Sequence, residues 1–157
     1  LAIFAIGLFK KTVIADTLAL YALPVFKAAN AGEPLALIDT WIAVFAYTAQ
    51  VYFDFSGYSD MAIGTARMLG IVLPINFLSP LRSASVTEIW RRWHITLGRW
   101  VQLYVFQPLS IPLARAAAMR GFGTWGTLFA AMIVPTMIAM LTIGVWHGAG
   151  WTFVVFG

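Results

Sequence analysis

The chain has 157 residues, of which 61% are hydrophobic and 10% are charged. A soluble globular domain is about half apolar and about a quarter charged, so this composition excludes that class and indicates an integral membrane protein. The net charge of +4 is concentrated in the middle of the chain, where seven arginines and one acid lie between Arg67 and Arg120. A basic stretch that is also rich in Trp indicates a cytoplasmic membrane-surface segment, with lipid and no nucleic acid as its partner.

The chain contains no cysteine, which excludes disulfides, thiolate metal ligands and a cysteine nucleophile. Its first residue, Leu1, and its last, Gly157, both lie inside apolar runs. We therefore interpret residues 1–157 as part of a single membrane domain of a longer protein whose N- and C-terminal portions are missing. The fold class we expect is all-α, a polytopic transmembrane helical bundle.

The N-terminal part is predicted to contain three helical segments. A first apolar segment ends at a break at the lysine pair, Lys10 and Lys11, and a short helix follows over residues 14–26. Asn, Gly and Pro residues indicate a loop over residues 27–34. Residues 35–53 form an apolar run of 19 residues with one charge. We expect a spanning helix there, because about 20 residues cross the hydrocarbon core.

A polar run, DFSGYSD, follows that helix directly at residues 54–60. Exposing it to lipid would be costly, so we expect it to face protein or water, with a helix break or re-entrant turn near Gly57. Asp54 and Asp60 are candidates for polarising a histidine or for anchoring such a turn. The Pro- and Asn-containing residues 70–84 predict an irregular link.

The start of the next helix is well marked. Ser85 precedes Glu88 by three residues, which is the spacing of a capping box. We expect a helix over residues 86–106, ended by Pro108 and Pro112. Its alternating Trp and Arg side chains are typical of an interfacial or re-entrant helix with tryptophans at headgroup depth.

The C-terminal part reads as a second spanning helix and the start of another segment. Residues 123–145 are continuously apolar and contain Pro135, where we expect a kink. Small residues at 146–150 predict a break, and residues 151–157 begin a further apolar segment.

The first of the two histidines lies on the predicted interfacial helix. If the helix is continuous, Trp90 and His94 share a face, Arg91 lies close to His94, and Trp93 adds a further aromatic wall. Nearby arginines and partial burial both favour a neutral imidazole, the form that a general base requires. The alternative is that His94 is a structural residue of a Trp- and Arg-rich helix.

The second histidine, His147, follows the predicted spanning helix and precedes Gly148-Ala149-Gly150. Glycines allow a substrate or another backbone to approach closely, and Trp146 could line the resulting cavity. The alternative is a histidine satisfied by a carbonyl at an interfacial turn.

Other uses of these side chains are open from the residues alone. His94 and His147 could be axial ligands of haem in an electron carrier. Asp54, Asp60 and His147 could form an ion or proton relay in a transporter. We expect no other metal site, because no close ligand pair such as HxxxH is present.

Four blocks of the chain resemble one known family, the membrane-bound O-acyltransferases, and within it the branch of the alginate O-acetyltransferases. They are LFKKTVIAD at residues 8–16, YFDFSGYSDMAIGTARMLG at 52–70, NFLSPLRSASVTEIWRRWHITL at 76–97 and GVWHGAGW at 144–151. The blocks occur in the order typical of the family and cover nearly the whole chain. The resemblance extends to the D-alanine transfer protein of teichoic acid.

The resemblance implies a multi-pass protein of the bacterial inner membrane, with a funnel through which acyl groups reach an extracytoplasmic polysaccharide. It implies no tightly bound cofactor. The donor would be acetyl-coenzyme A or another acyl thioester, and the acceptor would be reached through an extracytoplasmic partner acyltransferase. It assigns the principal catalytic role to His147 and a second active-site role to His94. Side chains expected to bind substrate or line the funnel are Trp90, Arg91, Trp93, Trp146, Asp54, Asp60 and Asn76.

The chain departs from the family pattern after the HITL motif. The Arg-Asp pair that usually follows is replaced by Gln102-Leu103, and the closing glycines of that block are absent. Since this stretch could shape the funnel or dock a partner, alginate does not follow as the acceptor.

Overall fold

The computed structural model describes all residues from Leu1 to Gly157, and its regular structure is entirely helical, as predicted. The chain divides into two compact units, Leu1–Trp93 and His94–Gly157. One helix, Thr124–His147, is long and apolar enough to cross a membrane, with a mean hydropathy of 2.2. The other span, expected at residues 35–53, lies in a helix that does not meet this criterion.

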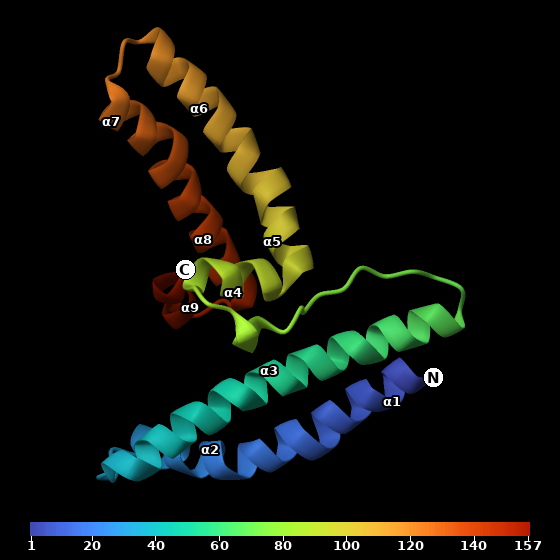
Figure 1. Cartoon of the computed structure of the whole chain (residues 1–157). Helices are drawn as coiled ribbons and strands as arrows, with labels where there is room; N and C mark the ends of the chain where they lie inside the picture. The colour runs from blue at the N-terminus through green and yellow to red at the C-terminus, as the bar shows by residue number, and fades with distance from the viewer. The chain divides into compact units, whose positions relative to one another are not determined.

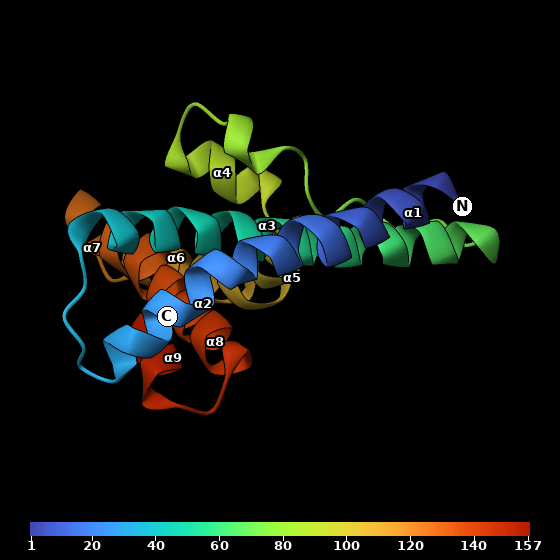
Figure 2. The same cartoon turned by 90° about the horizontal axis from the view of Figure 1, so that it is seen from below.

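In the first unit, an N-terminal helical rod packs along one long helix (Figures 1 and 2). The rod consists of α1 (Ala2–Phe9), a π-helical segment η1 (Lys10–Ala15) and α2 (Asp16–Asn30), and it packs against α3 (Leu37–Met68). The predicted break at the lysine pair is therefore wrong, because a wider turn of helix carries both lysines without interrupting the rod. The predicted loop is correspondingly shorter and begins after α2.

Glycines let this rod approach α3 closely. A Cβ atom added to Gly7 would lie 2.6 Å from the carbonyl oxygen of Gly57, and one added to Gly57 would lie 2.7 Å from the carbonyl oxygen of Gly7. Seven residues further along α3, a Cβ atom on Gly64 would lie 2.6 Å from the backbone nitrogen of Phe4. Small residues that allow backbones to touch are the usual basis of helix packing in membranes.

Two ion pairs close the same interface and explain why the polar run is not a turn. Lys10 Nζ lies 2.6 Å from Asp60 Oδ2, and Lys11 pairs with Asp54. Each carboxylate is thereby compensated, which makes its position among apolar helices tolerable. The break or re-entrant turn predicted near Gly57 is therefore wrong, and α3 runs through this segment without interruption.

We predict that Gly57→Ala lowers the stability of the full-length protein by about 1–3 kcal/mol, because the added methyl group has no room against α1. The measurement is the thermal unfolding midpoint in detergent. Gly98→Ala is the matched control, since Gly98 is also helical and nothing lies within 4 Å of its added Cβ atom. Equal midpoints for the two variants would contradict the close packing of α1 on α3.

The long helix ends in a turn that a glycine permits. Gly70 has φ 77°, and the backbone N–H of Ile71 donates to the carbonyl oxygen of Ala66 at 2.8 Å. This is a Schellman arrangement, which satisfies the last carbonyls of a helix. An irregular link follows, as predicted, with one short 3₁₀ turn, η2 (Pro80–Arg82).

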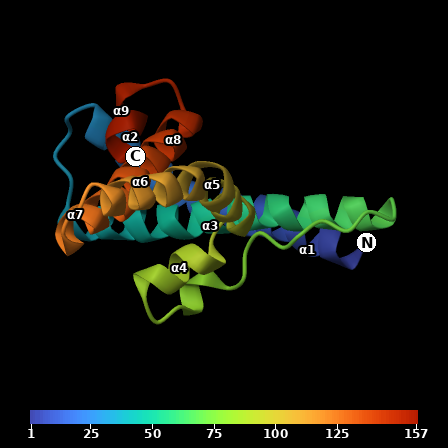
Figure 3. The same ribbon diagram turned by 90° about the horizontal axis from the view of Figure 1, so that it is seen from above.

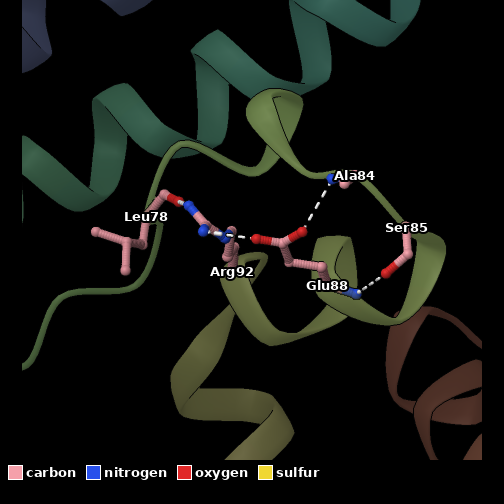
Figure 4. A network of polar contacts seen from close by, with 5 residues as sticks. All are labelled: Leu78, Ala84, Ser85, Glu88 and Arg92. Carbon is pink, nitrogen blue, oxygen red and sulfur yellow. Dashed lines mark hydrogen bonds and ion pairs between the residues drawn. The ribbon is translucent and has the colours of Figure 1, made fainter.

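The link leads into α4 (Val86–Arg92), which lies to one side of α3 (Figures 2 and 3). The predicted N-cap is confirmed: the N–H of Glu88 donates to Ser85 Oγ at 3.2 Å. The Glu88 carboxylate accepts the N–H of Ala84 at 2.9 Å, one residue before the N–H that a full capping box uses (Figure 4). That backbone hydrogen bond is the main cause that lowers the pKa of Glu88, and Arg92 acts in the same direction. The Glu88 side chain is thus held as a carboxylate.

Arg92 ties the end of α4 back to the link. Its guanidinium lies 2.6 Å from Glu88 Oε1 and donates to the carbonyl oxygen of Leu78 at 3.3 Å, and the N–H of Leu78 donates to the carbonyl oxygen of Arg92 (Figure 4). Of the two adjacent arginines, Arg91 and Arg92, the structure pairs Arg92 with Glu88.

The helix predicted over residues 86–106 is interrupted in its middle. Trp93 is extended, with φ −103° and ψ 127°, and His94 is left-handed, with φ 46° and ψ 53°. A new helix, α5 (Ile95–Val101), starts directly after His94. The predicted shared helix face of Trp90 and His94 is therefore wrong.

The second unit is a hairpin of two long rods (Figure 1). The first rod joins α5, a π-helical segment η3 (Gln102–Phe106) and α6 (Gln107–Met119); the second joins α7 (Thr124–Leu128), a π-helical segment η4 (Phe129–Ile133) and α8 (Val134–His147). The helix end predicted at Pro108 and Pro112 is wrong. Pro108 follows the widened helical turn of η3 by two residues, as Pro135 follows η4, and Pro112 is accommodated inside α6.

Proline and serine together explain how the second rod stays continuous. Pro135 has no N–H to donate to the carbonyl oxygen of Ala131, four residues earlier. Ser110 of the neighbouring α6 donates its hydroxyl to that oxygen at 2.5 Å. The widened helical turn of η4 ends two residues before the proline, and the helix continues through it into α8.

We predict that Ser110→Ala lowers the stability of the full-length protein by about 0.5–2 kcal/mol, since it leaves the Ala131 carbonyl without its donor. Thr142→Ala is the control, because the Thr142 hydroxyl donates to Ile138 within its own helix. Thermal unfolding in detergent distinguishes the two. A loss for Thr142→Ala as large as that for Ser110→Ala would refute the special role of this serine.

Candidate functional site

An aromatic cluster in the first unit holds the residue that precedes His94. Phe77 of the link and Trp93 lie with ring centroids 5.1 Å apart and ring planes at 86°. Tyr52 of α3 lies 6.0 Å from each of them, and Phe55 lies 5.0 Å from Phe77. Trp93, predicted as a wall of the site, is thus packed against Tyr52 of α3 and Phe77 of the link. Sequence reasoning missed Tyr52 and Phe77, although both lie within the motif blocks.

The left-handed backbone of His94 is uncommon for a residue with a side chain. Such a conformation costs about 1–3 kcal/mol and persists where the surroundings enforce it, often at functional sites. Here the carbonyl oxygen of His94 accepts the N–H of Gly98, so that His94 is the N-cap residue of α5. The imidazole is half-buried. The sharp turn, and not a helix face, therefore sets the direction of this side chain.

His147 is the last residue of α8, one residue later than the predicted break begins. Its ring centroid lies 4.9 Å from that of Trp146 and 5.6 Å from that of Phe156, whose ring plane is nearly perpendicular to it at 88°. Phe156 belongs to α9 (Trp151–Phe156), which the sequence predicted as the start of a further apolar segment.

The second unit brings the two histidines together. The ring centroids of His94 and Trp146 are 6.0 Å apart, and Trp146 is adjacent to His147. His94, Trp146, His147 and Phe156 thus form one ring cluster, although His94 and His147 are far apart in the sequence. The two histidine motifs thus meet at Trp146. The catalytic roles of the histidines and the lining role of Trp146 stay predictions.

Burial lowers the pKa of His94, and the nearby His147 lowers it further. The predicted direction, toward a neutral imidazole, is confirmed. The predicted cause is only half right, since burial acts as expected but the second cause is the other histidine and not an arginine. A neutral imidazole can accept a proton from an alcohol or donate its N–H hydrogen to an oxygen.

The remaining predicted site residues lie in the first unit. Trp90 is 64% exposed and Arg91 is also exposed, both on α4, while Asn76 is half-buried in the link. Asp54 and Asp60 form the ion pairs with the lysines of η1. Their roles at a substrate site stay predictions. No group of three or more His, Cys, Asp or Glu side chains suited to a metal ion forms within residues 1–157.

We predict that protonation of His94 destabilises the fold. Because the folded chain binds this proton more weakly than the unfolded chain, its contribution to stability is complete above about pH 6.5 and is lost as the pH falls below that value. The thermal unfolding midpoint of the full-length protein should therefore drop from about pH 7.5 to about pH 5.5. In His94→Gln the drop should be smaller, and an unchanged drop would assign the effect to another group.

Comparison with known proteins places this arrangement in a family. Residues 1–157 match the membrane-bound O-acyltransferase family throughout. The chain therefore belongs to this family of polytopic membrane proteins, as its motif blocks predicted.

Three similar proteins illustrate the range of relatives. The chain is 43% identical to a peptidoglycan O-acetyltransferase of Helicobacter pylori over 100% of its own length and 27% of that protein. It is 43% identical to a probable alginate O-acetylase of Pseudomonas aeruginosa, over 98% of the chain and 26% of that protein. It is 31% identical to a teichoic acid D-alanyltransferase of Streptococcus thermophilus, over 97% of the chain and 35% of that protein. The chain thus spans about a quarter to a third of the length of these relatives.

Proposed function

We propose that the full-length protein is an O-acyltransferase that moves an acetyl or similarly short acyl group from a cytoplasmic thioester, such as acetyl-coenzyme A, to a hydroxyl of an extracytoplasmic polysaccharide. Family membership supports the reaction class. The names of the three relatives describe transfer of acetyl or D-alanyl groups, and their polymers are peptidoglycan, alginate and teichoic acid. We place the protein in the bacterial inner membrane as a multi-pass protein, with residues 1–157 forming part of its single membrane domain.

The observation that carries the proposal is the ring cluster of the second unit, in which His94 and His147 share Trp146. Two imidazoles near one another, one of them partly buried, give a proton acceptor and a hydrogen-bond donor in one place. This is the minimum equipment for acyl transfer to an alcohol without a covalent enzyme intermediate.

In the proposed reaction, His147 accepts the proton of the acceptor hydroxyl while the hydroxyl oxygen attacks the thioester carbonyl. The carbon–oxygen bond forms, the carbon–sulfur bond breaks, and the proton passes from His147 to the departing thiolate. The products are an ester and a free thiol. His94 assists by a hydrogen bond that orients the donor. Positioned proton transfer of this kind contributes about 10²–10⁴-fold to a rate.

The exposed arginines of the first unit suit the donor's phosphates. Arg91 is exposed on α4 and makes no ion pair within residues 1–157, whereas its neighbour Arg92 is committed to Glu88 and Leu78. We propose that α4, which ends within the RRWH motif, is the interfacial helix, with Trp90 at headgroup depth and Arg91 available to phosphate or to anionic lipid.

The structure offers nothing that favours a transporter. Asp54 and Asp60, which would have to release and bind protons or ions in a relay, are each compensated by a lysine. These pairs support a structural role for both carboxylates.

We predict that His147→Ala in the full-length protein lowers acyl transfer by about 10²–10⁴-fold, because the general base is lost. The measurement is the ester-linked acyl content of the extracellular polysaccharide, at equal expression. Val145→Ala is the control, since Val145 lies on the same helix and is 60% exposed. Near wild-type transfer by His147→Ala would remove this histidine from the mechanism.

A further inference from the structure

The segment that follows the second histidine packs back on the helix that carries it. After the turn at residues 148–150, α9 lies against the end of α8. The contact depends on two glycines of α8 and the turn. A Cβ atom on Gly144 would lie 2.3 Å from the carbonyl oxygen of Phe153, and one on Gly148 would lie 2.4 Å from the Phe153 ring. A side chain at Gly144 would therefore meet backbone that cannot move aside, whereas one at Gly148 would displace the Phe153 ring.

The residue that follows α9, Gly157, faces the same helix. A Cβ atom on Gly157 would lie 2.5 Å from the carbonyl oxygen of Met140, and the Cα atoms of Gly144 and Gly157 are near enough that each would obstruct a side chain on the other. Glycines on both elements thus bring the two backbones into direct contact. Between them, this contact leaves α9 little freedom to slide or rotate along α8.

The consequence falls on His147. Phe156, next to Gly157 in the chain, has its ring centroid 5.6 Å from that of His147, with the ring planes at 88°. The ring centroid of Trp146, the residue before His147, lies 4.9 Å from that of His147, with the ring planes at 67°. An imidazole at the end of a helix, with glycines after it, would otherwise be free to change rotamer. The Phe156 ring packs beside the imidazole and is the α9 side chain in contact with it.

We propose that α9 is a positioning element for His147, and that Phe156, held in register by Gly144, Gly148 and Gly157, fixes the orientation of the imidazole. The inference rests on the proposed role of His147 as general base. Phe156 itself needs no contact with either substrate. Its effect is on the fraction of time that the imidazole points toward the acceptor hydroxyl, so it acts on turnover and not on binding.

The first test compares Phe156→Ala with Val155→Ala in the full-length protein. Both residues lie on α9, and both are largely exposed, at 66% and 85%, so neither truncation removes a core side chain. We expect Phe156→Ala to lower kcat by roughly 10- to 100-fold with little change in KM for donor or acceptor, since a misplaced base costs rate and not affinity. Phe156→Tyr, which keeps the ring, should restore most of kcat, and Val155→Ala should resemble wild type.

A second readout does not depend on acyl transfer. Diethyl pyrocarbonate modifies unprotonated imidazole, and mass spectrometry of the peptide that contains His147 gives the modification rate of this residue alone. At a pH where the imidazole is neutral, Phe156→Ala should raise that rate severalfold over wild type, and Gly144→Ala, which displaces α9, should do the same. Gly150→Ala is its control, because the added Cβ atom would make only ordinary contacts at 3.5 Å and beyond.

The two readouts separate this inference from the proposed function. A higher modification rate together with a lower kcat in Phe156→Ala supports both. An unchanged modification rate in Phe156→Ala overturns the inference, whatever the activity. A higher modification rate with unchanged kcat supports the contact of Phe156 with His147 but overturns its effect on turnover, and the activity of His147→Ala then tests the general base separately.

Discussion

The structure depends on one constraint, which is that backbone groups inside a membrane must find their hydrogen-bond partners within the protein. The chain places prolines inside long helices, and each proline removes a donor. At Pro135 the loss is met by a widened turn and by the Ser110 hydroxyl from the neighbouring rod. The second rod therefore reaches its full length, and His147 becomes its terminal residue. Without that compensation, α8 would not be a continuous helix, and His147 would not be held at its end.

Glycine contacts serve both units in the same physical way and with different results. In the first unit, Gly7 and Gly57 bring α1 and α3 together, and the close approach lets two lysines reach two aspartates. In the second unit, Gly144 and Gly157 bring α8 and α9 together, and the close approach sets an aromatic ring against a histidine. Close backbone contact is thus common to both units. The flanking side chains form stabilising ion pairs in the first unit and set the geometry around His147 in the second.

Local signals predicted those features whose partners are also local. The N-cap at Ser85, the irregular link and the apolar helix ending near His147 were all identified from short patterns. The breaks expected at the lysine pair and near Gly57 were wrong, because the residues that suggested them satisfy one another across α1 and α3. The pairing of His94 with His147 followed only from the family motifs, and Phe156 carried no signal, since a phenylalanine in an apolar segment looks like any other.

The turn at His94 was the feature least accessible to sequence reasoning, and its cause lies on both sides of the residue. Before it, Arg92 is bound to the link at Leu78 and Trp93 is packed against Phe77, so the chain arrives in a fixed direction. After it, the Gly98 N–H bonds to the His94 carbonyl oxygen and starts α5. The left-handed His94 lies between these two contacts and caps α5, at a cost of about 1–3 kcal/mol. A glycine would make the same turn with less strain but would bring no imidazole to Trp146, so the strain at this position is retained together with the side chain that the site uses.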